Sequence, residues 1–534
     1  MAVPEPPSDL DLWPRVKALS GWPDTNEDVV RTLSGGWQRA ADGFKSAAEF
    51  NAAAIPASWK DGAGAAMAGS TAKVLATARQ NVQGMQGLAG QANGFADATA
   101  QTKTAIGNLI RDNLQAYAGL SGLPAGAQEA FQASFVTTLA NAVTSYTAAM
   151  AAQVSANTLV LAAPPDARPV AGPPPGATPD QVKDWWNTLD QQQRATILRD
   201  SPELVRGLDG IPAAIRDSAN RAWLKQTIAD LTAQRDQLAP KVARDGHTRR
   251  GADPAEKNRL QQLNDKLGGL QAIQNRLESP QTGQPPAFLL KLDPAGDGKA
   301  VVAAGNPDTA ANVVTSVPGT SASLGGIGGD LNRSDRLWQS AQKAGSPSTA
   351  VVTWLGYDAP NTLVDATSES YADGGEKALQ DFQNGLRATH QGAPSQNTVL
   401  GHSYGTTAVG HAARDGSLDA DKLVFVASPG VGAEHAAELH LDGVDQSVVP
   451  QRVYSTVAKY DFINLVNQSP TDILGPDPAA PAFGGRTFES PPGDGGVLGV
   501  DFAAHGAYFD DGSEPGKPRN PALDELGAII AGKQ

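Results

Sequence analysis

A serine flanked by glycines is the residue in this sequence best placed to do chemistry. Ser403 lies in the segment Gly401–Gly405, which follows the apolar run NTVL and precedes the small-residue run TTAVGHAARDG. This is Gly-x-Ser-x-Gly between an expected strand and an expected helix, a turn that pushes a serine hydroxyl out at the carboxyl edge of a sheet. Larger residues at the glycine positions would collide with the strand and the helix. We predict that Ser403 is a nucleophile, and a plain glycine-rich turn is the alternative.

A serine nucleophile needs a histidine base to take its proton. In enzymes with this turn, the chain order is serine, then acid, then histidine. Three of the seven histidines, His435, His440 and His505, follow the helix after Ser403. The first two lie in AEHAAELHLD, which we expect to form a helix directly after the next strand, too early for the base. His505 follows all the expected strands, so we predict that it is the base.

The acid that orients the histidine should lie between serine and histidine at the end of a strand. Asp461 directly follows the segment QRVYSTVAKY, which has the pattern of a strand, and it is the predicted acid. Asp501 is the rival, because it lies four residues before His505. Asp472 and Asp477 lie in a proline-rich loop and are less constrained candidates.

Acyl transfer also needs two backbone N–H groups that bind the negative oxygen of the intermediate. We expect one from Tyr404, the residue after the nucleophile. The other should come from the loop after an early strand, where NVVTSV is followed by Pro-Gly-Thr. We assign this second donor to Thr320 or Ser321, with Thr320 preferred. These groups together predict a serine hydrolase that acts on a carboxylic ester.

The sequence gives no support for a metal or a cofactor. There is no cysteine, which excludes thiolate ligands, thiol nucleophiles and disulfides. DPAGDG resembles the start of a calcium loop, but Ala295 and Ala304 occupy its third and twelfth positions. GGIGGDL lacks the Lys-Ser/Thr of a phosphate loop, and His435 and His440 are five residues apart and not four. We therefore expect no cofactor and no metal.

The elements that must position these residues lie in the C-terminal half. From residue 286 onward, short β-branched runs alternate with stretches of helical pattern. Continuous apolar strands separated by helices predict a mostly parallel sheet with helices on both faces. The expected strands are FLLKLD and KAVVAAG, which flank a hairpin turn, followed by NVVTSV, TAVVTWLG, NTVLGHS, KLVFVAS and QRVYSTV.

Several segments of this half resemble an actinobacterial alpha/beta hydrolase family of uncharacterised function. The matching text is WWNTLD, LDGIPAAIRDSAN, LDPAGDGKAVVAAGNPDTAANVVTSVPGT, GHSYGTTAVG, ASPGVG and KYDFI, spread over residues 180–510. The resemblance implies an α/β-hydrolase fold. It carries the family's expected triad onto Ser403, Asp461 and His505, and it implies no particular substrate.

The N-terminal part is expected to be helical. Residues 25–160 are rich in Ala and Gln, with apolar residues at steps of three and four, and IPASWKDGAGAAMAG breaks this pattern. Two long antiparallel helices joined at the break are the simplest interpretation. Trp59, Gly62 and the small residues that follow resemble the Trp-x-Gly helical-hairpin proteins of actinobacterial type VII secretion, with one extra residue in the turn. A convincing Tyr-x-x-x-Asp/Glu export signal is lacking, and a generic helical bundle is the alternative.

A proline-rich segment marks the expected boundary between the N-terminal domain and the rest of the chain. Residues 162–179 contain seven prolines and predict an extended linker. The expected organisation is an all-α domain over 1–161, this linker, a helical segment with a helix hairpin over 180–285, and the α/β-hydrolase domain over 286–534. Arg249 and Arg250 lie at the basic tip of the hairpin, where a solvated loop is expected. We expect 1–160 to be a tethered module for partner binding, self-association or export, and capping of the active site is the competing possibility.

Charge and hydropathy restrict the classes of partner and substrate that we expect. The net charge is −14, and nearly all of the acidic excess lies in residues 281–534, which disfavours nucleic acid and favours a neutral ester or lipid as substrate. The N-terminal residues lack a secretory signal, and no apolar run is long enough to span a membrane. We expect a cytoplasmic protein, or one exported without a cleaved signal. The alternative function is a type VII-associated scaffold with a vestigial hydrolase domain.

Overall fold

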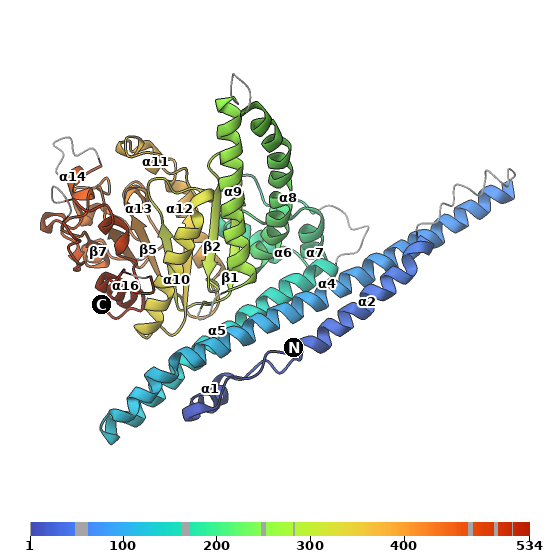
Figure 1. The fold of residues 1–534 in the computed structure, drawn as a ribbon, viewed down its shortest axis with the longest axis horizontal. Coiled ribbons are helices and arrows are strands. Elements are labelled where there is room, and N and C mark those ends of the chain that lie inside the picture. Colours follow the sequence, from blue (N-terminus) through green and yellow to red (C-terminus); the bar gives the residue numbers. More distant parts are fainter. Residues whose placement is uncertain are drawn as a thin grey trace.

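The computed structural model describes residues 2–48, 62–162, 170–246, 253–280, 284–467, 474–495, 500–514 and 516–534. It consists of an α/β domain beside a set of long helices (Figure 1). The predicted fold class is confirmed: a mostly parallel sheet with helices on both faces in the C-terminal half, and helices in the N-terminal part.

The sheet has eight strands in the order β1-β2-β4-β3-β5-β6-β7-β8. β1 and β2 form the expected antiparallel hairpin, β2 also pairs antiparallel with β4, and all other pairs are parallel. Seven strands were expected from the sequence, and the eighth has only two exposed residues that carry no apolar pattern. The strands are β1 Ala287–Asp293, β2 Lys299–Ala304, β3 Asn312–Val317, β4 Thr349–Leu355, β5 Gln396–His402, β6 Lys422–Val426, β7 Val453–Thr456 and β8 Arg486–Thr487.

Successive residues of the buried strands point to opposite faces of the sheet, so each face has its own core. Val313 packs into the core on the side of α12 (Glu376–Thr389) and α13 (Tyr404–Arg414), and helices α6 (Pro179–Thr188) and α7 (Gln191–Asp200) add to this layer. Val314 packs into the other core, with α10 (Ile327–Lys343) and α16 (Pro521–Ile530). Both faces are therefore buried, which explains the continuous apolar runs in the sequence.

Two helices of the middle segment form a hairpin against the edge strand β1. They are α8 (Ala213–Gly246) and α9 (Pro254–Glu278), and they project from the sheet (Figure 1). The base of α9 presses on the short turn Leu324–Gly326, where a Cβ atom at Gly269 would lie 1.7 Å from the Leu324 carbonyl oxygen. Buried Arg276 of α9 also forms an ion pair of 2.8 Å with Asp335 of α10. The tip of the hairpin, with Arg249 and Arg250, lies outside the described residues.

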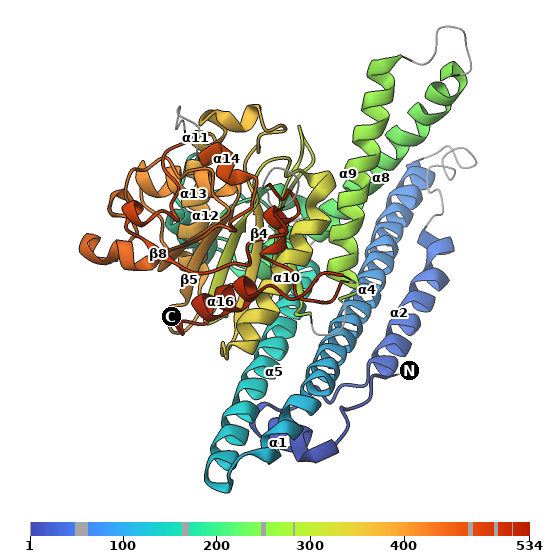
Figure 2. The same cartoon turned by 60° about the vertical axis from the view of Figure 1, so that its left-hand side comes forward.

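The N-terminal helices are α1 (Leu12–Ser20), α2 (Glu27–Ala48), α4 (Gly62–Gly119) and α5 (Ala125–Ala162). α2 packs along α4, and α5 returns along the other half of α4, so the structure adds a third long helix to the two expected (Figures 1 and 2). A buried ion pair of 3.0 Å between Lys103 and Glu27 joins α4 to the start of α2. Trp59 lies outside the described residues, and Gly62 begins α4.

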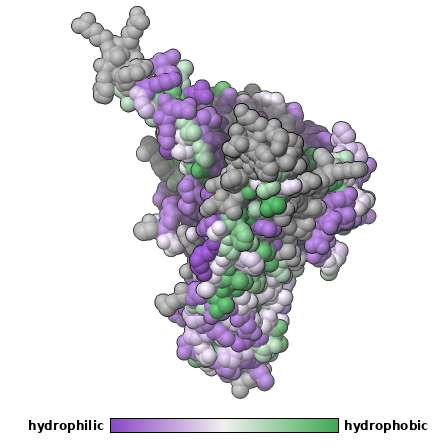
Figure 3. All heavy atoms as spheres, turned by 90° about the vertical axis from the view of Figure 1, so that its right-hand side faces the viewer, coloured by the Kyte–Doolittle hydropathy of each residue, from purple (hydrophilic) through white to green (hydrophobic). Residues whose placement is uncertain are grey.

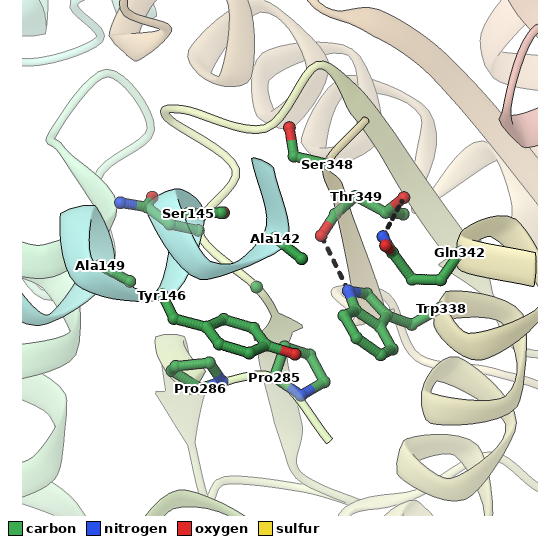
Figure 4. A pocket seen from close by; sticks show the side chains of 12 residues that line it. Ala142, Ser145, Tyr146, Ala149, Pro285, Pro286, Trp338, Gln342, Ser348 and Thr349 are labelled. Atoms are coloured by element: carbon green, nitrogen blue, oxygen red, sulfur yellow. Dashed lines mark hydrogen bonds between the residues drawn. The ribbon is translucent and has the colours of Figure 1, made fainter. Parts of the chain in front are cut away.

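The structure differs from the expectation of a free tether, because α4 and α5 pack against the α/β domain. Tyr146 of α5 lies beside Pro285, Pro286 and Trp338, and the Trp338 indole donates a hydrogen bond of 3.0 Å to the Thr349 carbonyl (Figure 4). The cavity that these residues line is only about 10 Å³, whereas a larger one of about 540 Å³ lies between α4, α5 and α10. Apolar residues of α4 and α5 share one core cluster with α1 and with Trp338 of α10, and α5 also packs along α7 and α8. A helical pattern alone does not say what covers an apolar face.

The position of this junction matters for function. Thr349 begins β4, so α5 meets the sheet at the edge where the parallel strands start. Ser403 follows β5 and therefore lies at the opposite, carboxyl edge. The described residues of the N-terminal helices thus pack at the edge of the sheet opposite to the predicted nucleophile and do not cap it. Among the described residues, no helix combines the length and the hydrophobicity needed to cross a membrane.

A buried carboxyl group joins the middle segment to the α/β domain. Asp308, in the loop after β2, accepts hydrogen bonds from the Ala213 amide at the start of α8 (2.7 Å) and from the Thr389 hydroxyl at the end of α12 (2.6 Å). Burial raises the pKa of Asp308 from 3.8 to about 6. The folded protein therefore holds a proton on Asp308 at pH values where the unfolded chain has lost it.

This raised pKa predicts a stability that falls as the pH rises through the window between about 4 and 6. Above both pKa values, the ionised carboxylate costs the folded state up to about 3 kcal/mol relative to the protonated form. Asp308→Asn keeps the shape and cannot ionise, so its free energy of unfolding should fall less over this window. Urea unfolding of both proteins at half-unit pH steps measures the difference, and parallel pH profiles would contradict it.

Candidate active site

Ser403 sits in a strained turn between β5 and α13. Its backbone angles are φ 55° and ψ −134°, a region that residues with side chains rarely adopt. The neighbouring glycines make the turn possible: a Cβ atom at Gly401 would lie 2.6 Å from Thr406 Cα, and one at Gly405 would lie 2.2 Å from the Val317 carbonyl oxygen. The Ser403 amide donates a hydrogen bond of 3.0 Å to the Val426 carbonyl of the next strand. The turn therefore holds Ser403 at the carboxyl edge of the sheet.

The predicted base and the predicted acid are in direct contact. His505, on the one-turn helix α15 (Ala504–Ala507), places Nδ1 at 2.8 Å from Oδ1 of Asp461. Asp461 is fully buried in the loop after β7, and it also accepts hydrogen bonds from the Ile463 amide (2.9 Å) and the Tyr508 hydroxyl (2.7 Å). The carboxylate thus fixes the imidazole ring with Nδ1 inward. His505 and Ser403 line the same cavity.

The rival acids are occupied elsewhere. Asp501 accepts hydrogen bonds from the backbone amides of Asp494, Ala503 and Ala504, which hold the pKa of its carboxyl below the usual value. Its carboxylate therefore caps the start of α15, and the hydrogen bond that His505 Nδ1 donates is accepted by Asp461. Asp477 accepts from the Ala479 amide at 2.8 Å, and Asp472 lies outside the described residues.

The residue before Ser403 contacts the backbone of His505. His402 Nε2 lies 2.7 Å from the His505 carbonyl oxygen, and its ring packs edge-on against Phe509. Burial lowers the pKa of His402 well below its usual value, with a further contribution from the positive charge of Arg333. His402 is therefore neutral, and the contact requires its Nε2 to carry the hydrogen that it donates to His505. This hydrogen bond ties α15 to the serine turn.

Two backbone amides beside Ser403 are available to bind an oxyanion. Among the described residues, neither the Thr320 amide nor the Tyr404 amide has a hydrogen-bond acceptor. The alternative donor, Ser321, is engaged, because its amide donates to the Pro360 carbonyl at 2.8 Å. The loop of Thr320 lies close to the serine turn: a Cβ atom at Gly319 would lie 2.8 Å from the Tyr404 nitrogen. The geometry therefore keeps Thr320 and Tyr404 as the two candidates.

The other two late histidines lie outside this site. The helix expected around them is wrong: the segment forms only a three-residue turn, Ala436–Glu438. His435 Nδ1 contacts the Ala482 carbonyl at 3.2 Å, and His440 Nδ1 contacts the Ala413 carbonyl at 3.3 Å. The Pro-Gly-Val-Gly turn before them and the loop around them give the chain an irregular path that an apolar spacing does not reveal.

Two cavities meet at Ser403. One has a volume of about 320 Å³ and is lined by Ser403, Thr320, Tyr404, Thr367 and a set of apolar residues. The apolar residues are Leu363, Ala366, Pro429, Phe462, Ile463, Leu465, Val466, Leu474 and Phe502. The other, of about 360 Å³, contains His505 and the polar side chains of Ser321, Asp330 and Arg333. Ser403 thus lies where an apolar and a polar space join.

One group of side chains in the described part of the chain could hold a metal ion. The ligand atoms of Asp373, Glu376 and His411 lie within 4.8 Å of one another. His411 is near the far end of α13, and a nitrogen of the Arg414 guanidinium lies 3.5 Å from its Nδ1. None of these residues lines either cavity at Ser403.

Sequence reasoning missed three residues that shape the site. They are Tyr508, which donates to Asp461; His402, which contacts the carbonyl of His505; and Arg333, which lines the polar cavity. Two signals were present in the sequence: Tyr508 follows His505 by one helical turn, and His402 lies inside the serine motif. Arg333 carried no signal, because its place depends on how α10 packs behind the loop of Thr320.

Models of two protein families match parts of the chain. A model of an alpha/beta hydrolase family matches residues 293–468, and a model of a WXG100-like domain matches residues 2–143. A solved structure described as an arylesterase aligns at 12% identity with a TM-score of 0.26, over 53% of this chain and 98% of that chain.

Relatives occur in mycobacteria. An uncharacterised protein of Mycobacterium tuberculosis is 33% identical over 378 residues, which are 65% of this chain and 55% of that protein, so the chain spans about half the length of this relative. An uncharacterised protein of Mycobacterium bovis is 31% identical over 189 residues, which are 33% of this chain and 69% of that protein. With the strand order and the serine turn, these matches show that the chain belongs to an actinobacterial alpha/beta hydrolase family and carries a WXG100-like domain in its N-terminal part.

Proposed function

We propose that this protein is a serine hydrolase that cleaves carboxylic esters through an acyl-Ser403 intermediate. The observation that carries the proposal is the hydrogen bond between His505 and the buried Asp461, beside a serine in a strained turn. A buried carboxylate that orients an imidazole near a serine is the arrangement that activates a serine hydroxyl. The match to an alpha/beta hydrolase family supports the hydrolase class.

In the proposed first half-reaction, the Ser403 hydroxyl oxygen attacks the ester carbonyl carbon while Nε2 of His505 takes the hydroxyl proton. The carbonyl oxygen becomes negative and is bound by the Thr320 and Tyr404 amides. The carbon–oxygen bond to the alcohol then breaks, and the alcohol leaves with the proton from His505. Asp461 stabilises the imidazolium that forms in between.

In the second half-reaction, water replaces the alcohol. His505 takes a proton from the water, the resulting oxygen attacks the acyl carbon, and the bond to Ser403 breaks as the serine oxygen regains a proton. Tyr508 and His402 act as positioning residues throughout: the first donates to Asp461, and the second donates to the carbonyl of His505. Burial and the charge of Asp461 raise the pKa of Tyr508, so its hydroxyl keeps the proton that it donates.

The nucleophile can be tested by labelling. A fluorophosphonate probe should label the wild-type protein, and Ser403→Ala should abolish both the label and the hydrolysis of p-nitrophenyl butyrate. Mass spectrometry of the labelled peptide identifies the site. Equal esterase activity in both proteins would remove Ser403 from the mechanism, and no label or activity in either would favour the scaffold function.

The acid can be tested with two matched amide substitutions. Asp461→Asn should lower kcat by about a thousandfold or more, because the amide leaves His505 in the wrong tautomer. Asp501→Asn removes a carboxylate of the same size that touches only backbone amides, so kcat should change by less than about fivefold. Circular dichroism and thermal unfolding serve as controls for folding. The reverse ranking of the two variants would show that Asp501 is the acid.

We propose a second role for the N-terminal helices, self-association through their outer faces. Val29, Leu33 and Phe44 of α2 are 64%, 57% and 48% exposed, and steps of four and eleven residues place them on one face of the helix. Val74 and Leu88 of α4, at 68% and 40% exposure, are also spaced to share a face. Figure 3 shows apolar side chains gathered on this helical side of the molecule. The match to a WXG100-like domain supports an interaction role, with export by the type VII route as part of the same proposal.

Light scattering after size-exclusion chromatography tests the self-association. The wild-type protein should change from a dimer mass to a monomer mass on dilution, and Leu33→Glu with Val74→Glu should be monomeric at every concentration because each charge would be desolvated in the interface. Ester hydrolysis should be the same in both proteins. A wild-type protein that is monomeric at 100 μM would refute the self-association.

A further inference from the structure

The two cavities at Ser403 differ in chemistry, and the position of the base decides which part of an ester each one receives. Proton return to the leaving alcohol requires that the alcohol oxygen face His505. His505 lines the polar cavity and is not part of the apolar one. The alcohol half of the substrate therefore belongs in the polar cavity, and the acyl half belongs in the apolar cavity.

The polar cavity offers both donors and acceptors and has little net charge. Arg333 and Asp330 form an ion pair of 3.0 Å in its wall, and the side chains are 34% and 16% exposed. Ser321 lies in the same wall, with its own hydroxyl donating to the Asn361 carbonyl at 3.1 Å. A neutral group with several hydroxyls can accept from the guanidinium and donate to the carboxylate at once. An anionic group would meet the Asp330 carboxylate and an acidic domain.

The apolar cavity continues onto the protein surface. Leu363, Leu465 and Phe502 line it and are 59%, 59% and 71% exposed, so they also form its rim. Val364, next to the rim, is 79% exposed. Large exposed apolar residues that gather at one opening mark a place where apolar material binds. An acyl chain longer than the cavity could extend across this rim.

We propose that the substrate is an ester of a medium or long acyl chain with a neutral polyol, such as a glycerol or a sugar, and that Arg333 and Asp330 select the polyol. This inference rests on the proposed ester hydrolysis at Ser403 and names its substrate class. The acyl chain fills the apolar cavity, and the polyol hydroxyls replace water around the Arg333–Asp330 pair. Hydrolysis then releases a fatty acid and a free polyol.

The first test compares esters that differ in one half only. With octanoate as the acyl group, kcat/KM for 1-octanoylglycerol should exceed that for propyl octanoate by at least tenfold, because a site that binds hydroxyls loses those bonds with the propyl ester. At low salt, kcat/KM for the octanoate ester of glycerol 3-phosphate should not exceed kcat/KM for 1-octanoylglycerol. In a series of glycerol esters that starts at butanoate, kcat/KM should rise about threefold to fourfold for each added methylene group until the acyl chain fills the apolar cavity.

The second test uses a variant with a matched control. The quantity to compare is kcat/KM for 1-octanoylglycerol divided by kcat/KM for propyl octanoate. In Arg333→Met, this ratio should fall to about three or less. Lys377→Met removes the same charge from the exposed surface of α12, where the side chain is 83% exposed, and should leave the ratio unchanged. Fluorophosphonate labelling of Ser403 at the wild-type rate shows that the variant's site is intact.

The outcomes separate this inference from the proposed function. If the probe labels Ser403 and simple esters are cleaved, the proposed function holds whatever the polyol preference is. A wild-type preference for propyl octanoate, or an unchanged ratio in Arg333→Met with normal labelling, would overturn the polyol assignment alone. If Arg333→Met does not fold, the comparison of esters on the wild-type protein still decides. Absence of labelling and of all ester hydrolysis would reject both proposals.

Discussion

The close approach of three backbone segments at Ser403 is the constraint on which the site depends. The end of β3, the turn and the start of α13 lie so near one another that Cβ atoms at Gly319, Gly401 or Gly405 would overlap their neighbours at 2.2 to 2.8 Å. This approach brings the Thr320 loop beside the Tyr404 amide and forces the serine backbone to φ 55°. Such strain costs on the order of 1–3 kcal/mol, and the packed sheet and helix on both sides offset it. The cavities and the base are then arranged around a serine whose position is fixed.

Sequence reasoning reached most of the fold and the main residues of the candidate site, for a physical reason. Apolar runs, glycines and chain order are local properties, so they located seven strands, the serine turn, Asp461 and His505. The sequence favoured Asp461 over Asp501 because Asp461 lies at a strand end. The structure adds the contact between Asp461 and His505, although both carboxyl groups lie in loops that meet in an isolated bridge. Arg333 and the apolar rim depend on loop packing over long distances in the chain. The packing of α5 on the α/β domain could not be predicted either. An apolar helix face predicts that the face is buried, but it does not indicate which element covers it.

The three parts of the chain are less separate than the proline-rich segment suggests. α9 of the middle segment presses on the turn Leu324–Gly326, which follows the Thr320 loop, and Gly269 is needed for that contact. The Arg276–Asp335 pair joins the same helix to α10, which carries Asp330 and Arg333. The helical hairpin therefore supports both the loop of Thr320 and one wall of the polar cavity. Its base contributes to the site although none of its side chains lines either cavity.

The packing of α5 at the amino edge of the sheet gives the molecule two opposite poles. Binding at the helical pole would leave the mouth of the apolar cavity uncovered. A protein held by its N-terminal helices would then keep the cavities at Ser403 open to the solvent. Insertions or changes in the helices could therefore accumulate during evolution with little effect on the chemistry at the other pole.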